Sequence, residues 1–194
     1  MNDPTKKKPS RAQAEAAVKT LLEYIGEDPK REGLQDTPKR VIKAYDEWFN
    51  GYDLDPKSLL STTFSDNMNY DDIIIVKDIR LESYCEHHLA PIIGNVHIAY
   101  LPDDKVLGLS KLARIVDCFA KRLQMQEKLT AQIAHAIQEH LNPKGTGVII
   151  DAIHHCLTTR GAHKSNSLMR TQTMLGCFKS DKSYPSYFVN MIKD

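Results

Sequence analysis

Apolar residues three and four positions apart predict two helices in the first fifty residues of the chain. The first helix begins after Ser10, which has Gln13 as its capping-box partner. The second begins near Thr37, an expected N-cap, with Pro38 in its first turn. The apolar positions are Val18, Leu21, Leu22 and Ile25 in the first helix and Val41, Ile42, Tyr45, Trp48 and Phe49 in the second. Such faces can pack as a hairpin, so residues 1–60 are a predicted N-terminal helical region.

Beyond residue 72 the pattern changes to short apolar strands separated by two longer helices. Residues 53–70 are predicted to be loop, and the segment from 77 to Ser83 is a polar stretch after the first strand. The predicted elements are, in order, strand 73–76, strand 92–101, a helix capped by Ser110, helix 126–141, strand 148–153, strand 171–178 and a short helix from Pro185. Strands in pairs joined by short turns favour an antiparallel sheet with helices on one face, an α+β domain over residues 61–194.

Composition adds exclusions rather than a function. The chain has 194 residues, of which 41% are hydrophobic and 26% charged, and its formal net charge is +1. A net charge this small gives no bulk attraction to nucleic acid or to an anionic membrane, so an anionic ligand needs a local basic cluster. No apolar run approaches the roughly 20 residues of a membrane helix. The lysines at 6–8 lack the apolar stretch of a signal peptide, so a cytoplasmic protein is expected.

Two separated motifs contain metal-ligating residue types. Cys85 and His88 are three residues apart and can reach one ion from a single turn, and thiolate with imidazole favours zinc. If the strand over 148–153 continues, His154 and Cys156 share one face and His155 points the other way. Cys85, His88 and Cys156 then form an open catalytic site. With His154 as a fourth ligand the same residues form a closed structural site.

The open arrangement would leave two histidines free for chemistry. Zinc with three protein ligands keeps one position for water and lowers the pKa of that water to about 7. His87 and His154 would then lie beside the metal and move protons. The remaining histidines at 97, 135, 140 and 163 are expected at the surface or around the site. Cys118 and Cys177 lie among apolar residues and are expected in the core.

Basic residues at three places suit a polyanion. Lys111 and Arg114 fall in the first turns of the helix that starts near Ser110, where free N–H groups and the helix dipole favour phosphate. Arg160 follows Cys156 by four residues and adds a guanidinium near the metal motif. Further basic residues, Arg40 and Lys43, lie three apart on the second helix. Each pair alone is also the ordinary composition of a solvated helix face.

Taken together, the motifs at residues 85–88, 108–114, 124–127 and 154–156 resemble the GTP cyclohydrolase I family, and the resemblance extends from about residue 26 to residue 179. It implies a tunnelling fold, in which the sheets of several subunits join into barrels, and a homodecamer with active sites at subunit interfaces. It implies zinc at Cys85, His88 and Cys156, and it gives His154 a role in proton transfer.

The resemblance also implies a reaction, the conversion of GTP and water to 7,8-dihydroneopterin triphosphate and formate, which begins tetrahydrofolate and pteridine biosynthesis. His87 or His154 would protonate N7 of the imidazole ring. The residues expected to bind GTP are Glu127 and Gln126 at guanine, and Ser110, Lys111, Arg114, Arg160 and, from a neighbouring subunit, Arg40 and Lys43 at the triphosphate. Glu127 suits the paired N–H donors of guanine, although a carboxylate in the first turn of a helix is also favoured by the dipole alone.

One segment departs from the family pattern, and two rival functions remain open. After Arg160 the family has a run rich in Ser and Thr, whereas this chain has Leu168, Met169 and Arg170. The departure raises the possibility of a changed substrate position or rate. One rival is another tunnelling-fold enzyme, such as the nitrile reductase of queuosine synthesis or a pterin synthase. The other is a non-catalytic, zinc-stabilised ring that binds GTP without releasing formate.

Overall fold

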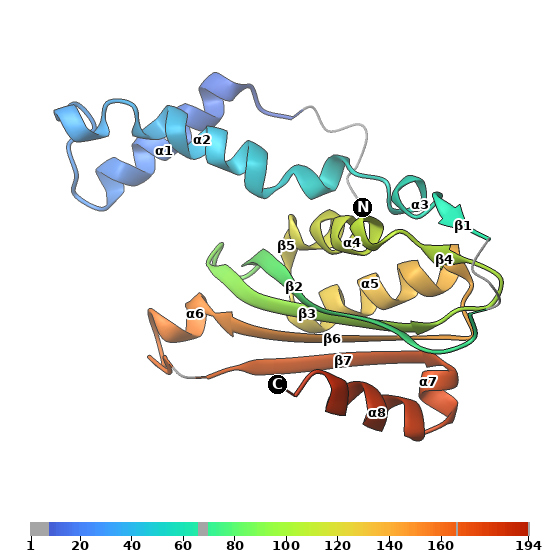
Figure 1. Cartoon of the computed structure of the whole chain (residues 1–194). Helices are drawn as coiled ribbons and strands as arrows, with labels where there is room; N and C mark the ends of the chain where they lie inside the picture. Colours follow the sequence, from blue (N-terminus) through green and yellow to red (C-terminus); the bar gives the residue numbers. More distant parts are fainter. Residues whose placement is uncertain (1–7, 66–69, 166, 194) are drawn as a thin grey trace. The chain divides into compact units, whose positions relative to one another are not determined.

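The computed structural model describes residues 8–65, 70–165 and 167–193, and the chain divides into two compact units, residues 1–49 and 50–194 (Figure 1). The first unit contains α1 (Arg11–Tyr24), the 3-10 turn η1 (Glu32–Leu34) and α2 (Thr37–Trp48). The capping box of α1 is confirmed, because Ser10 N–H donates to Gln13 Oε1 at 2.8 Å and Gln13 N–H donates to Ser10 Oγ at 3.3 Å.

The second helix begins one residue earlier than predicted. Arg40 N–H donates to the carbonyl oxygen of Asp36 at 3.0 Å, so Asp36 is the N-cap and Thr37 is already helical. Within the first unit, Arg11 joins α1 to α2 through an ion pair with Asp46 at 2.8 Å. Neither helix buries a residue completely in this unit.

The second unit is built around a five-stranded sheet with the order β5-β2-β3-β6-β7. All neighbouring strands are antiparallel except β2 and β5, which are parallel. The elements are η2 (Asn50–Asp53), α3 (Pro56–Leu59), β1 (Thr63–Phe64), β2 (Ile74–Cys85), β3 (Pro91–Leu101), β4 (Val106–Leu107), α4 (Leu109–Ala120), β5 (Leu123–Gln124), α5 (Gln126–Leu141), β6 (Gly145–His154), α6 (His155–Thr158), β7 (Met169–Gly176), α7 (Cys177–Ser180) and α8 (Ser183–Met191).

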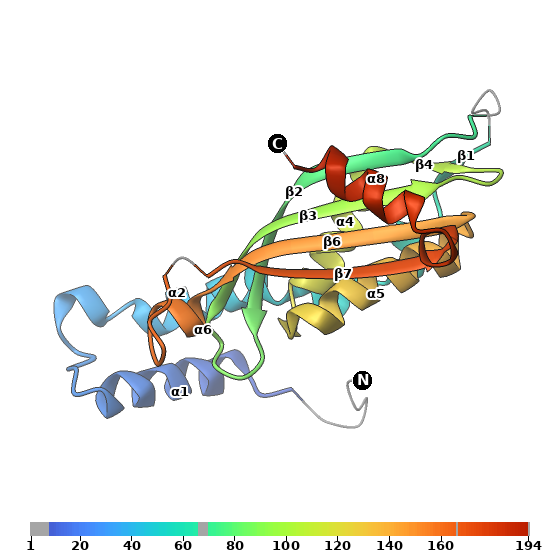
Figure 2. The same ribbon diagram turned by 90° about the horizontal axis from the view of Figure 1, so that it is seen from below.

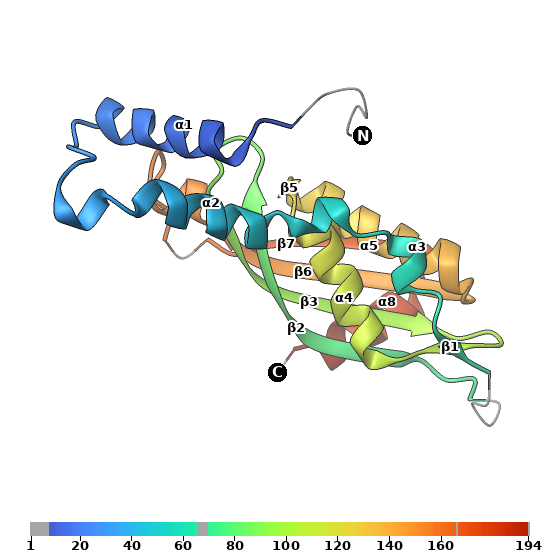
Figure 3. The ribbon, with the colours of Figure 1, turned by 90° about the horizontal axis from the view of Figure 1, so that it is seen from above.

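Helices cover both faces of this sheet. The pair α4 and α5 packs on one face (Figure 3), over a core that includes Val96, Ile98 and Ile133. On the opposite face, α7 and α8 cover one end of the strands (Figure 2), where Phe178 and Phe188 belong to a second core. The α+β class with an antiparallel sheet is therefore confirmed. The prediction that helices cover one face of the sheet holds for α4 and α5. It did not include α8, which packs on the opposite face.

The prediction that the first strand of the sheet ends at residue 76 is wrong. β2 continues through the polar stretch from residue 77 to Ser83 and ends at Cys85. The pairing with β3 shifts between Val76 and Ile79, and Asp78 within this bulge has φ +60°. The extra residues change which positions face inward, so Leu81 and Ser83 become fully buried. A simple alternation of inward and outward positions counted from residue 73 therefore assigns the residues after the bulge to the wrong face of the sheet.

Other predicted boundaries also move. Gly108, not Ser110, is the N-cap of α4, and α8 begins at Ser183 before Pro185. The predicted loop over 53–70 contains α3 and β1, since the Asp55 carboxylate caps α3; its residues 66–69 lie outside the described part of the chain. Residues 50–60 group with the second unit, where Gly51 N–H donates to Lys121 O at 3.1 Å. Within the described residues, no helix combines the length and apolar character needed to cross a bilayer.

Candidate active site

The ends of β2 and β6 meet at one edge of the sheet, and three possible metal ligands gather there. Strand register places Ser83 opposite Ile92, and Ile92 opposite His154, so Cys85 and the residues after His154 emerge together. Cys85, His88 and Cys156 each offer a ligand atom, and these atoms lie within 4.8 Å of one another. The predicted triad is therefore brought together.

The turn after β2 brings His88 back toward Cys85. Leu89 N–H donates to Cys85 O at 2.9 Å, and Cys85 N–H donates to Ala90 O at 2.8 Å. Leu89 has φ +53°, an uncommon conformation for a branched side chain. The closed turn places His88 Nδ1 3.9 Å from Cys85 Sγ.

Cys156 reaches the group from a helical turn instead of a strand. β6 ends at His154, and α6 begins at His155. The prediction that His154 and Cys156 share a strand face is therefore wrong, although it named the correct cysteine. Burial is the main cause that raises the pKa of the Cys156 thiol, and the neighbouring Cys85 raises it further. A bound cation would reverse this preference, because metal ligation requires the thiolate.

Arg160 contacts the metal group directly. Its Nη1 lies 2.8 Å from His88 Nε2, and a guanidinium can only donate, so His88 Nε2 accepts. The single proton of the neutral imidazole must then be on Nδ1, which leaves neither ring nitrogen available to a metal. Metal ligation by His88 therefore requires Arg160 to move away from this ring.

His154 is held from the other side by Gln126. His154 Nε2 lies 2.7 Å from Gln126 Oε1, and Gln126 is completely buried at the start of α5. Burial is the main cause that lowers the pKa of His154, while the charge of Glu127 opposes this shift. The imidazole is thus favoured in its neutral form. No local sequence pattern indicates this contact, because 28 residues separate the partners.

Gln126 was expected to help hold guanine, but its side chain has other partners. The amide Nε2 donates to Ile150 O and to Met169 O, both at 3.0 Å, and to Thr171 Oγ1 at 3.1 Å. Thr130 Oγ1 lies 2.7 Å from Thr171 Oγ1. Sequence reasoning missed both threonines; the spacing of Gln126 and Thr130 on one helix face is the only local signal.

Glu127 and His87 are exposed near the same edge. Glu127 is in the first turn of α5, next to buried Gln126. His87 lies in the turn after Cys85, and its ring centroid is 6.3 Å from that of His88. Both side chains are accessible to a ligand.

Within the second unit, the beginning of α4, which carries Ser110 and Lys111, is not at this edge. Ser83 Oγ donates to Ala120 O at 2.7 Å, so the end of α4, and not its beginning, lies near the metal group. Ser110 and Lys111 are at the beginning of α4, roughly 15 Å of helix rise from Ala120. Arg114 is exposed in the middle of α4. Arg40 and Lys43 are exposed on α2 in the first unit, where Arg40 pairs with Asp36 at 3.4 Å.

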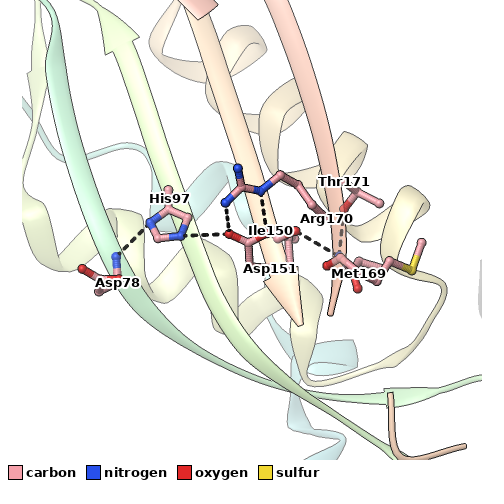
Figure 4. A network of polar contacts seen from close by, with 8 residues as sticks. Asp78, His97, Ile150, Asp151, Met169, Arg170 and Thr171 are labelled. Carbon is pink, nitrogen blue, oxygen red and sulfur yellow. Dashed lines mark hydrogen bonds and ion pairs between the residues drawn. The ribbon is translucent and has the colours of Figure 1, made fainter. Parts of the chain in front are cut away.

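The departing segment of β7 has a structural role on both faces of the sheet. Met169 O accepts a hydrogen bond from Gln126. Arg170 makes a bidentate ion pair with Asp151, in which Nε donates to Oδ1 at 2.7 Å and Nη2 donates to Oδ2 at 2.6 Å (Figure 4). Leu168 is exposed. Asp151 Oδ2 also lies 3.7 Å from His97 Nε2. His97, expected at the surface or around the site, is only 5% exposed and so does not lie at the surface.

A sequence model of the family described as GTP cyclohydrolase I matches residues 14–193. This chain belongs to the GTP cyclohydrolase I family. The GTP cyclohydrolase 1 of Maricaulis maris (strain MCS10) is 53% identical over 186 residues, which are 96% of this chain and 91% of that protein. The GTP cyclohydrolase 1 of Hyphomonas neptunium (strain ATCC 15444) is 54% identical over 185 residues, 95% of this chain and 90% of that protein.

A solved structure, an archaeosine synthase QueF-like protein in the apo form, covers 54% of this chain and 93% of its own with 18% identity and a TM-score of 0.45. Family membership makes the chain an enzyme, a hydrolase. The resemblance proposed on the four motifs is thereby confirmed.

Proposed function

We propose that this member of the GTP cyclohydrolase I family converts GTP and water to 7,8-dihydroneopterin triphosphate and formate, the first step of tetrahydrofolate and pteridine biosynthesis. The observation that carries the proposal is the convergence of Cys85, His88 and Cys156 at one edge of the sheet. His154 is the last residue of β6, two positions before Cys156 in the chain, and its Nε2 is held by Gln126. A metal group with a neutral imidazole close by in sequence suits hydrolysis of a ring C–N bond.

Zinc is the proposed metal, with Cys85, His88 and Cys156 as its ligands. Two sulfur donors and one imidazole nitrogen match the preference of zinc, and three protein ligands are typical of catalytic sites. When bound there, zinc would supply Lewis acidity and a water of lowered pKa.

The side chains around this group would bind and protonate the purine. Glu127 is proposed to accept from the ring N–H and amino group of guanine, since its carboxylate is exposed next to buried Gln126. His87 and His154 are proposed to move protons, and one of the two is proposed to protonate N7 of the imidazole ring. The neutral form of His154 that burial favours is the form that can also take a proton back.

The triphosphate is proposed to be bound by residues from more than one copy of the chain. The expected ligands are Ser110, Lys111, Arg114, Arg160, Arg40 and Lys43. Within the second unit, Arg160 lies at the metal edge of the sheet, whereas Ser110 and Lys111 lie at the opposite end of α4. A homo-oligomer, proposed here as a decamer, would supply the missing groups. β7 is the last strand of the sheet, and such an edge favours pairing with another chain.

A cytoplasmic enzyme of this kind should be testable as the purified, zinc-loaded protein. Incubation with GTP is expected to yield formate and, after oxidation, a fluorescent pteridine, and a chelator should abolish both. His135→Ala is a matched control, because His135 is exposed on α5 away from the proposed machinery. Binding of GTP with neither product would refute the proposal and favour the non-catalytic ring.

A further inference from the structure

The orientation of the Gln126 amide is determined by its surroundings. Three acceptors lie around one end of the side chain, the carbonyl oxygens of Ile150 and Met169 and the hydroxyl oxygen of Thr171. Two of them are carbonyls, which cannot donate, so the NH₂ group must point at them. The amide oxygen must therefore point the other way, toward His154 Nε2 at 2.7 Å.

Figure 4 shows Ile150, Met169 and Thr171 close together on neighbouring parts of β6 and β7. The site that holds the amide is built from two strands, and Gln126 itself is fully buried. Thr130 strengthens the site, because its hydroxyl donates to Gln126 O at 2.7 Å. The same hydroxyl oxygen lies 2.7 Å from Thr171 Oγ1, and since Thr130 uses its hydrogen on Gln126 O, Thr171 can donate to it. A flip of the amide would bring its oxygen against two carbonyl oxygens and leave its NH₂ group facing His154, at a cost of a few hydrogen bonds.

We propose that Gln126 is a positioning residue that fixes the tautomer of His154, with the proton on Nε2 and the lone pair on Nδ1. An amide oxygen only accepts, so Nε2 must carry the proton whenever this contact exists. In the neutral ring the lone pair then belongs to Nδ1, the nitrogen that the contact with Gln126 leaves open. This inference rests on the proposed function for the consequence of the tautomer, but the tautomer itself does not depend on turnover.

The test reads the ring nitrogens of His154 directly. The full-length protein, labelled with ¹⁵N-histidine and free of substrate, is examined by long-range ¹H–¹⁵N correlation, with and without zinc; His154→Asn assigns the signals. We expect a protonated Nε2 and an unprotonated Nδ1 in the neutral ring. A protonated Nδ1 in the wild-type protein would overturn the inference, and this measurement requires no substitution at Gln126.

Gln126→Met tests the cause. The thioether fills the same volume without an amide oxygen, so the His154 signals should change to a mixture of tautomers. Turnover should fall roughly 10–100-fold, the usual effect of losing an orienting partner, with KM for GTP unchanged. A raised KM with unchanged kcat would instead mean that Gln126 contacts the purine, and the inference would be abandoned.

Gln124→Met is the matched control. Gln124 is also a buried glutamine, with its amide donating to Phe119 O at 2.8 Å and Gln132 Oε1 at 2.9 Å. It has no contact with His154 among these bonds, so its replacement should cost similar stability while the His154 tautomer stays fixed. Loss of the fixed tautomer in both variants would mean loosened packing instead of a specific acceptor. Absence of product from the wild-type enzyme would refute the proposed function and leave the spectra to decide the tautomer.

Discussion

Individual donor atoms distinguish the proposed metal ligands at the sheet edge from the proposed proton carrier. Cys156 Sγ points into the group with Cys85 and His88, whereas Nε2 of His154 is occupied by Gln126. Replacing a metal ligand and replacing a proton carrier should therefore have different effects on the zinc content of the protein.

Cys156→Ala is expected to lose both zinc and turnover, because two donors hold zinc far more weakly than three. His154→Ala is expected to retain zinc and lose turnover by about 10²–10⁴-fold, the usual contribution of an acid–base group. Metal content by atomic emission and formate release by the same preparations measure the two effects. Zinc missing from His154→Ala would make His154 a fourth ligand and would restore the closed structural site.

The buried His97 should make stability depend on pH. Burial is the main cause that lowers its pKa from 6.5; Asp78 and Asp151 oppose this shift, and Arg170 and Lys77 add to it. The unfolded chain then binds a proton at a higher pH than the folded chain does. Stability should fall as pH drops below about 6.5 and stop falling once folded His97 is also protonated.

The measurement is the denaturation midpoint of the wild-type protein and of His97→Asn across this pH range. The difference between the two curves isolates His97 from other groups that titrate nearby. A difference that stays constant with pH would show that His97 does not change its protonation on unfolding.

At the scale of elements, β6 and β7 are joined by an ion pair that no local sequence pattern predicts. Asp151 is only 13% exposed, and Arg170 binds it through two nitrogens. Arg170→Met should lower the free energy of unfolding by about 1–2 kcal/mol, between the values for surface and buried pairs. Asp151→Asn combined with Arg170→Met should cost less than the sum of the single changes, as measured by denaturant unfolding. Strict additivity would mean that the pair contributes nothing.

Local patterns predicted the long helices better than the short helices and the strands. The predicted helix over 126–141 matches α5 exactly in its bounds, because its apolar spacing is regular and Asn142 ends it in the left-handed conformation. β2 was cut short at 76, since a bulge with Asp78 at its centre is invisible to a count of alternating residues. Propensity describes neighbours in sequence, and a bulge is a property of two paired strands.

The candidate site follows the same division. Cys85 and His88 were found because three residues in one turn are a local signal, and Cys156 because its motif ends a strand. The hydrogen bonds of Gln126 to Met169 and Thr171 cross more than forty residues, and only the sheet register brings these residues together. The departure at 168–170 pointed to the right strand but did not reveal that Arg170 faces Asp151.

At the scale of the whole molecule, the groups proposed to bind GTP come from three places. Two of these places are at different ends of the second unit, and the third is in the first unit. The metal group and His154 are at the end of β2 and β6, whereas Lys111 begins α4 at its other end. In the second unit of one chain, the proposed metal group and the proposed phosphate ligand Lys111 therefore lie at opposite ends of α4. The proposed oligomer predicts that neighbouring chains complete each other.

Mixing two inactive variants tests this arrangement. Lys111→Ala should lose triphosphate binding and His154→Ala should lose proton transfer, so each protein alone is expected to be nearly inactive. If one site takes Lys111 from one chain and His154 from another, then unfolding and refolding an equal mixture places both intact residues in about a quarter of the sites. Formate release should recover to that fraction of the wild-type rate, while mixing without refolding should recover less.

The control combines two variants at the metal edge, His154→Ala and Cys156→Ala. These variants should not complement each other, because both residues of one site come from the same chain. Activity that stays absent in the first mixture would show that a single chain supplies Lys111 and His154 to the same site.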